Sequence, residues 1–179
     1  MIITIGVCGS VAAIKVPGIL SQIKEQRSYM VNIIATTKSR NFVGPGALGP
    51  YAYGLYYDDD KDLKYGTHHI TIAKTTGIFI LLPATANTIA KVANGICDTF
   101  LTQTILALPK NAKKIFCPAM NTEMLWSKPT VNNFMTLKEN GWTYVSPVVG
   151  RLACGGTGDG VLAKTETIIN TIIKEAEGI

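Results

Sequence analysis

The stretch from Ile78 to Gly95 constrains the fold more than any other part of the chain. It begins with a run of apolar residues long enough for a strand buried on both faces. Pro83 has no N–H for a ladder, so we expect the strand to end there. A helical pattern follows, with Asn87 or Thr88 as its N-cap and Gly95 in its C-terminal turn. Such a strand–loop–helix unit lies at the carboxyl edge of a parallel sheet, where ligands bind. The alternative is a capped connection that binds nothing.

The size and composition of the chain favour one compact domain over residues 1–179. Hydrophobic residues make up 47% of the chain and charged residues 16%, a balance that excludes extensive disorder. The net charge is +5, with Lys and Arg scattered along the sequence. The one tight group, Lys110, Lys113 and Lys114, fits a solvated turn better than a nucleic-acid surface. We therefore expect no nucleic-acid partner, whereas phosphorylated small molecules remain candidates.

Membrane, secretory and metal-binding signals are missing from the sequence. No apolar run approaches the ~20 residues of a membrane span, and the N-terminus has no features of a signal peptide. The cysteines show no C-x-x-C spacing, which predicts reduced thiols in a cytoplasmic protein with no membrane partner. The histidines are the adjacent His68 and His69, so we expect no metal site.

Two other strands lead into loops rich in hydroxyl groups. Ile2 to Val7 predicts a strand followed by Gly9, Ser10 and a helix, whose free N–H groups suit an anion such as phosphate. The absence of G-x-G-x-x-G argues against a dinucleotide and is compatible with a mononucleotide, although many such turns bind nothing. Val31 to Ala35 predicts the next strand. The residues from Thr36 to Ser39 could add donors to a phosphate or act as ordinary N-caps.

The remaining segments alternate between helix and strand patterns. We expect helices over residues 99–108 and 129–140 and from about 166 onward, with strands over 114–117 and a fifth strand over 142–145. This alternation predicts a three-layer α/β domain with a parallel sheet. Two segments have no clear period: Gly44 to Tyr57, which we expect to be a long loop, and the glycine-rich residues 150–160, expected to be a mobile or closely packed loop.

Three polar residues outside these loops are candidates for chemistry. His69 precedes the central strand and would suit a proton acceptor near neutral pH, although an isolated histidine is more often structural. Asn121 follows a strand end, where an ordinary turn residue is the alternative. Cys154 lies in the glycine-rich loop, whose N–H groups could favour a thiolate or position a proton donor. An inert thiol is the alternative there.

Five segments, in order along nearly the whole chain, together resemble the flavin-containing cysteine decarboxylases. They are GSVAAIK at 9–15, the histidine before Ile70, PATANTIAKVANGICD at 83–98, PAMNTEM at 118–124 and LACGGTGDG at 152–160. Each is weak alone, but the ordered set is specific. Within this family the chain is most similar to the phosphopantothenoylcysteine decarboxylases, because the related peptide-modifying enzymes lack the acid cysteine that matches Cys154.

The resemblance implies a Rossmann-like (flavodoxin-like) fold, FMN as cofactor, and a homo-oligomer with active sites between subunits, either a trimer or a dodecamer built of trimers. The implied reaction converts 4′-phosphopantothenoylcysteine, a phosphorylated cysteine conjugate, to 4′-phosphopantetheine in coenzyme A biosynthesis. It proceeds through transient oxidation of the thiol, loss of CO₂ and re-reduction of the ene-thiol. Two alternatives remain: a peptidyl-cysteine decarboxylase of ribosomal peptide maturation, and a non-catalytic flavin-binding regulator of a phosphatase.

The resemblance also implies roles for individual residues. His69 would be the base, Asn121 would hold the carboxylate of the substrate, and Cys154 would return a proton. The implied FMN-binding residues are Gly9, Ser10, Val11, Thr37, Ser39, Phe42, Thr85, Ala86, Asn87 and Thr102. The implied substrate-binding residues are Ala119, Met120, Asn121 and Met124.

The chain departs from the family pattern at two places on the substrate side. The family usually has Trp directly after the residue matching Met124, but here Leu125 intervenes before Trp126, and Pro129 is displaced by one position. We therefore expect a shifted substrate clamp. The second departure follows the Cys-Gly pair, where an acidic residue is usual and this chain has Gly156.

Overall fold

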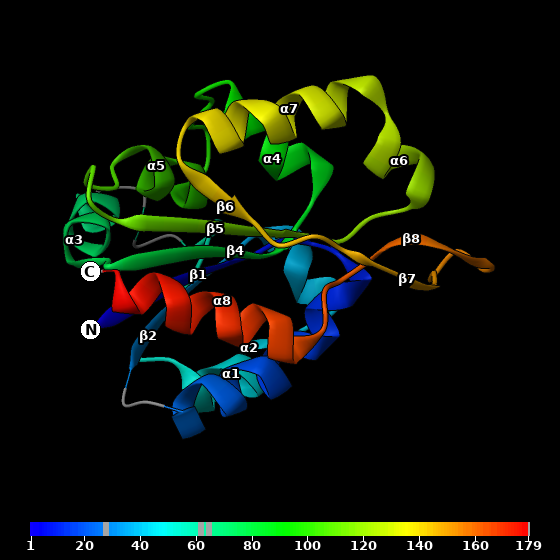
Figure 1. Ribbon diagram of the computed structural model, residues 1–179. Helices are drawn as coiled ribbons and strands as arrows, with labels where there is room; N and C mark the ends of the chain where they lie inside the picture. Colours follow the sequence, from blue (N-terminus) through cyan, green and yellow to red (C-terminus); the bar gives the residue numbers. More distant parts are fainter. Residues whose placement is uncertain (27–28, 61–62, 64–65, 179) are drawn as a thin grey trace.

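The central element of the fold is a parallel β-sheet. The computed structural model describes residues 1–26, 29–60, 63 and 66–178, and in this part of the chain six parallel strands form the sheet, in the order β3-β2-β1-β4-β5-β6 (Figure 1). Their bounds are β1 Ile2–Val7, β2 Met30–Ala35, β3 Gly54–Tyr57, β4 Ile78–Ala84, β5 Lys113–Pro118 and β6 Trp142–Tyr144. The expected Rossmann-like α/β fold is confirmed.

The central strands are buried on both faces because helices cover both sides of the sheet. Every residue of β4 is buried, as are five of the six residues of β1. Their apolar side chains therefore alternate between two helical layers, which explains the unbroken apolar runs in the sequence. The strand order reverses between β1 and β4, so that the carboxyl ends of these two strands open onto a crevice.

The helices divide between the two faces of the sheet (Figure 1). One layer holds α1 (Val16–Gln26), α2 (Pro45–Leu48) and α8 (Thr165–Glu177). The other holds α3 (His68–Thr75), α4 (Ala86–Ala93), α5 (Phe100–Leu106), α6 (Thr122–Trp126) and α7 (Lys128–Glu139). Short 3-10 turns η1 (Val11–Lys15), η2 (Thr37–Asn41) and η3 (Gly49–Tyr51) join them to the strands. Among the helices described, none is long and apolar enough to cross a membrane.

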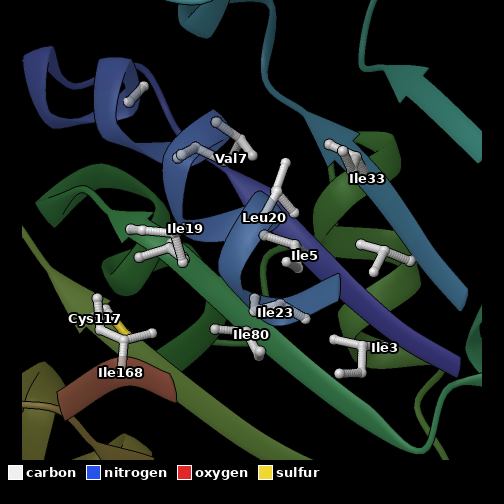
Figure 2. Packing of buried hydrophobic residues seen from close by; sticks show 14 of the residues in the cluster. Ile3, Ile5, Val7, Ile19, Leu20, Ile23, Ile33, Ile80, Cys117 and Ile168 are labelled. Atoms are coloured by element: carbon white, nitrogen blue, oxygen red, sulfur yellow. The ribbon is translucent and has the colours of Figure 1, made fainter. Parts of the chain in front are cut away.

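The core beneath α1 and α8 follows from helical spacing. Ile19, Leu20 and Ile23 lie on one face of α1 and pack against Ile3 and Ile5 of β1 (Figure 2). Each such side chain contributes about 1.5–3 kcal/mol by leaving water. The apolar face of α8 is buried in the same cluster and closes it from the β5 side (Figure 2), through Ile168, Ile169 and Ile172.

Two segments expected to be loops contain strands. Gly44 to Tyr57 forms α2, η3 and the edge strand β3, so the strand at Trp142 is the sixth and not the fifth. This edge strand is short and mostly half-buried, which leaves little periodic signal. Residues 150–160 belong largely to an antiparallel hairpin of β7 (Val148–Arg151) and β8 (Thr157–Val161). Its glycines lower the strand propensity that the sequence displays.

The central β4–α4 unit also differs from expectation at its boundaries. β4 continues past Pro83 to Ala84, because its pairing with β5 is irregular between Leu81 and Ala84, so that the ladder requires no N–H at Pro83. α4 then begins two residues after β4, with Thr85 as its N-cap; the Thr85 hydroxyl accepts a hydrogen bond from the N–H of Thr88 at 3.4 Å. The prediction of Asn87 or Thr88 as cap was wrong by two or three residues. Gly95, with φ of 69°, ends the helix as expected.

Candidate active site

Two hollows lie at the carboxyl edge of the sheet. The first, which we call the cysteine pocket, has a volume of about 290 Å³ and is lined by residues of η1, the end of β5 and the β7–β8 hairpin, including Asn121 and Cys154. The second, the hydroxyl pocket, has a volume of about 500 Å³ and is lined by the loops after β1, β2, β3 and β4 and by the start of α5. Gly9 contributes to one hollow and Ser10 to the other, so the two lie next to each other.

The hydroxyl pocket contains most of the residues that the resemblance assigned to FMN. They are Gly9, Thr37, Thr85, Ala86, Asn87 and Thr102. The polar groups of the lining are mainly side-chain hydroxyls and one side-chain amide, and Lys38 adds a positive charge. Such neutral donors and acceptors match the phosphate, sugar hydroxyls and ring edge of a mononucleotide.

The packing of the loops around the hydroxyl pocket also fits a bound group. A Cβ added to Gly9 would lie 2.6 Å from the Cβ of Lys38, so only glycine allows the loops after β1 and β2 to approach so closely. The hydroxyl oxygen of Thr36, which lines the same pocket, is buried and has no hydrogen-bond partner within the described residues. A buried polar group of this kind favours a ligand that satisfies it. The residues present therefore fit FMN.

The charged groups of the hydroxyl pocket are largely balanced. Lys91 donates to Asp98 at 2.7 Å, and this hydrogen bond lowers the pKa of the Asp98 carboxyl. Asp58 accepts a hydrogen bond from the backbone N–H of Leu101 at 3.0 Å and thereby ties the end of β3 to the first turn of α5. Burial raises the pKa of Asp58. The pocket thus carries no large excess of charge.

The cysteine pocket is organised by the side-chain amide of Asn121. This residue is the N-cap of α6: its Oδ1 accepts the N–H of Glu123 at 2.9 Å. Because the oxygen is occupied, the Nδ2 group is left to donate, and it lies 3.1 Å from the Sγ of Cys154. The cap therefore orients a hydrogen-bond donor toward a thiol in the same pocket.

The four cysteines lie in contrasting environments, of which that of Cys154 suits chemistry best. All are free thiols; Cys8 and Cys117 are buried, whereas Cys97 and Cys154 are exposed. Burial raises the pKa of both Cys8 and Cys117, so neither forms a thiolate readily. Of the two exposed thiols, only Cys154 lines a pocket that also holds Asn121.

The β7–β8 hairpin is attached to α6 through the residues around Asp159. The hydroxyl of Thr122 donates to the carbonyl of Asp159 at 2.6 Å, and the indole N–H of Trp126 donates to its carboxylate at 3.1 Å. The backbone N–H of Met120 donates to the carbonyl of Gly160 at 3.1 Å. These contacts fix the strand β8 beside the segment that carries Asn121, and so they set the position of Cys154.

The inserted Leu125 has a definite structural consequence. Its side chain is buried in the core between the sheet and α7, whereas Trp126 is exposed and turned toward the hairpin. Sequence reasoning left Trp126 without a role and did not single out Thr122. The one signal in the sequence for this contact was the displacement of Trp126 by one position.

The remaining expected site residues fall into three groups. Ser10, Val11, Ala119 and Met120 line the cysteine pocket, whereas Met124 lines the hydroxyl pocket. Ser39 and Phe42 line neither; the buried Ser39 hydroxyl donates to the carbonyl of Thr36 at 2.7 Å. The structure thus places most of the expected cofactor- and substrate-binding residues in the two hollows and leaves Ser39 and Phe42 outside them.

His69 lies apart from Asn121 and Cys154 within the chain. It lines a third hollow, of about 210 Å³, together with Cys97 and residues of α5. Figure 1 shows α3, which carries His69, at the opposite end of the sheet from the hairpin. Within the described residues, no three His, Cys, Asp or Glu side chains come together as a metal site would require.

Comparison with known proteins identifies the family. The model of the family described as Flavoprotein matches residues 1–177. The chain belongs to this flavoprotein family. A relative from Streptococcus mutans, named probable phosphopantothenoylcysteine decarboxylase, is 37% identical over 175 residues, which cover 95% of this chain and 96% of that protein.

Solved structures with the same fold include two kinds of decarboxylase. One is a mutant PPC decarboxylase in which serine replaces a cysteine, in complex with pantothenoylaminoethenethiol. It is 30% identical to this flavoprotein, and the two structures superpose with a TM-score of 0.90 over 98% of each chain. The peptidyl-cysteine decarboxylase EpiD is 26% identical, with a TM-score of 0.81 over 96% of this chain and 98% of its own.

The attachment of the hairpin predicts a strong effect of Gly160→Ala. Gly160 has φ of 118°, and an added Cβ would collide with the carbonyl oxygen of Met120. We expect the free energy of unfolding to fall by about 1–3 kcal/mol, measured by urea denaturation. The control is Gly18→Ala in α1. Because the added Cβ has no atom within 4 Å there, we expect the free energy of unfolding to be unchanged or slightly raised. Equal urea midpoints for the two variants would contradict the importance of this contact.

Proposed function

We propose that this flavoprotein is an FMN-dependent decarboxylase of coenzyme A biosynthesis that converts 4′-phosphopantothenoylcysteine to 4′-phosphopantetheine. The observation that carries the proposal is the contact of 3.1 Å between the Asn121 amide and the Cys154 thiol. It brings a neutral donor suited to a carboxylate and an exposed thiol suited to proton transfer into one pocket, beside the pocket that fits FMN. The named relatives support the same assignment.

The hydroxyl pocket is the proposed FMN site. The loops carrying Gly9, Thr36, Thr37, Thr85 and Asn87 would hold the cofactor, with Ser10 at the boundary to the cysteine pocket. Bound FMN supplies a reversible two-electron acceptor, which the loss of CO₂ from a cysteine requires and which no side chain provides. The protein contributes orientation and proton transfer.

Asn121 is the proposed carboxylate-binding residue. Its Nδ2 group donates hydrogen bonds without a full positive charge. A cation would stabilise the carboxylate of the bound substrate and so oppose the departure of CO₂, whereas a neutral amide holds the group in place at less cost to the transition state.

Cys154 is the proposed acid. Loss of CO₂ leaves an ene-thiol, and its reduction to the saturated thiol needs a proton in addition to the hydride equivalent that reduced FMN would supply. An exposed thiol in the same pocket can deliver that proton to carbon. The mutant relative that lacks a cysteine is named as a complex with an ethenethiol, which supports this order of events.

His69 is the proposed base, and it requires a second subunit. His69 lines a different hollow from Asn121 and Cys154, and α3 lies at the opposite end of the sheet from the hairpin of its own chain (Figure 1). We therefore propose that these residues meet across a subunit boundary in a homotrimer, or in a dodecamer built of trimers. Each subunit would be one domain of residues 1–179. The free cysteines fit a cytoplasmic enzyme.

A comparison of two substrates tests the proposed function directly. The purified protein, loaded with FMN, is incubated with 4′-phosphopantothenoylcysteine and separately with a peptide that ends in cysteine. We expect CO₂ and a saturated thiol from the first substrate only. Reaction of the peptide alone would establish a peptidyl-cysteine decarboxylase, and tight FMN binding without reaction of either would favour a non-catalytic regulator.

Cys154→Ser should separate CO₂ loss from the formation of the saturated product. Because serine is a far weaker acid than a thiol, we expect the saturated thiol to form about 10²–10⁴ times more slowly, while the ene-thiol accumulates in a single turnover and FMN affinity is unchanged. Mass spectrometry of the quenched reaction distinguishes the two products. Undiminished formation of 4′-phosphopantetheine would refute the role of Cys154.

His69→Asn tests both the base and the shared site. CO₂ release should fall by about 10²–10⁴ with FMN still bound, whereas the control His68→Asn changes an exposed neighbour that lines none of the three hollows and should retain activity. Mixed oligomers of His69→Asn and Cys154→Ser subunits should form some saturated product, because a shared site combines one intact residue from each. No recovery on mixing would place the whole site within one chain.

A further inference from the structure

Two cations lie in the pocket that holds Asn121 and Cys154. Lys15 is the last residue of η1 and Arg151 the last residue of β7; both are exposed, and both line the cysteine pocket. Across the described part of the chain, neither forms an ion pair, unlike Arg40, Lys91 and Lys113. The lining of the pocket contains no Asp or Glu.

The charge of the cysteine pocket therefore differs from that of the hydroxyl pocket. In the hydroxyl pocket Lys91 is neutralised by Asp98, whereas here two cations share one hollow with no opposing carboxylate in its lining. Two like charges that line one hollow without a counter-ion create a positive potential, which attracts an anion with more than one charge. A phosphate group, with its several acceptor oxygens, is the ligand that Lys and Arg together suit best.

The rest of the lining indicates how a ligand would extend through the pocket. The remaining side chains of the lining are mostly apolar and include Val11, Ile14 and Leu152. A ligand that fits this set of groups has a carboxylate for Asn121, a phosphate for the two cations and an uncharged arm that joins them. A peptide ending in cysteine has the first of these features but not the last.

From this we infer that Lys15 and Arg151 form a phosphate subsite that selects a phosphorylated cysteine conjugate over a peptide. The inference rests on the proposed function, because it assigns the reacting end of the substrate to Asn121 and Cys154. It adds Lys15 and Arg151 as the residues that decide between the two substrate classes, and it gives neither of them a part in the reaction itself.

The phosphate of FMN is a second source of the same chemistry. Ser10, which also lines the cysteine pocket, is among the residues expected to contact the flavin phosphate. If Lys15 and Arg151 served the cofactor, their removal would weaken the binding of FMN but not that of riboflavin, which has no phosphate. The two sources are therefore separable by binding measurements.

The test uses Lys15→Gln, Arg151→Gln and the double variant of the FMN-loaded enzyme, with Lys110→Gln as control. Lys110 is an exposed lysine in a hollow at the amino end of β5, away from both site pockets. For the phosphorylated substrate we expect each single variant to raise KM about three- to tenfold with kcat unchanged, the magnitude of one exposed ionic contact. KM for the dephosphorylated substrate, pantothenoylcysteine, should stay the same in every variant.

Ionic strength gives a second measure. KM of the unmodified enzyme for the phosphorylated substrate should rise with added salt, and this dependence should be weaker in the double variant. An unchanged preference of the double variant for the phosphorylated substrate would overturn the inference. So would a loss of FMN affinity in the double variant without a matching loss for riboflavin.

A binding experiment separates failure of the subsite from failure of the proposed function. Calorimetry with 4′-phosphopantothenate and pantothenate, neither of which carries the reacting cysteine, should show tighter binding of the phosphorylated compound, and the double variant should abolish the difference. That result supports the subsite even if no substrate is decarboxylated. Equal binding of the two compounds by the unmodified protein would overturn the subsite even if decarboxylation occurs.

Discussion

The parallel pairing of β1 with β4 is the constraint on which the candidate site depends. Both strands are buried on both faces, and the strand order reverses between them. Because the chain must leave each strand at its carboxyl end, the loops that carry Gly9 and Thr85 are brought together at one edge of the sheet. The hydroxyl pocket is therefore a consequence of sheet topology, and its glycine and hydroxyl residues adapt it to a ligand.

The cysteine pocket depends on a different kind of interaction. Cys154 lies on a hairpin outside the main sheet, and its position is set by contacts of β8 with the α6 segment, through Asp159 and Gly160. Asn121 links the two elements through its side chain: Oδ1 caps α6, and Nδ2 donates a hydrogen bond to the Cys154 thiol on the hairpin. The geometry of the reacting groups is thus maintained by a few hydrogen bonds between two small elements.

Parts of this architecture are visible in the sequence because they follow from local pattern. The apolar runs of β1, β2, β4 and β5 and the helical spacing of α1, α7 and α8 predict the α/β alternation, since burial on two faces or on one stripe leaves a characteristic period. The edge strand β3 and the hairpin β7–β8 were missed. Both are short and rich in Gly or Tyr, and both are held in place by neighbours distant in sequence.

The sequence by itself determined the fold class, the candidate residues and the resemblance to the flavin-containing cysteine decarboxylases. These depend on residue type and order along the chain. Only the tertiary structure decided that Asn121 meets Cys154 while His69 lies in a separate hollow, and that Lys15 and Arg151 share a pocket. The physical reason is that contacts between residues from η1, β5 and the hairpin depend on how whole elements pack, and no local period records that packing.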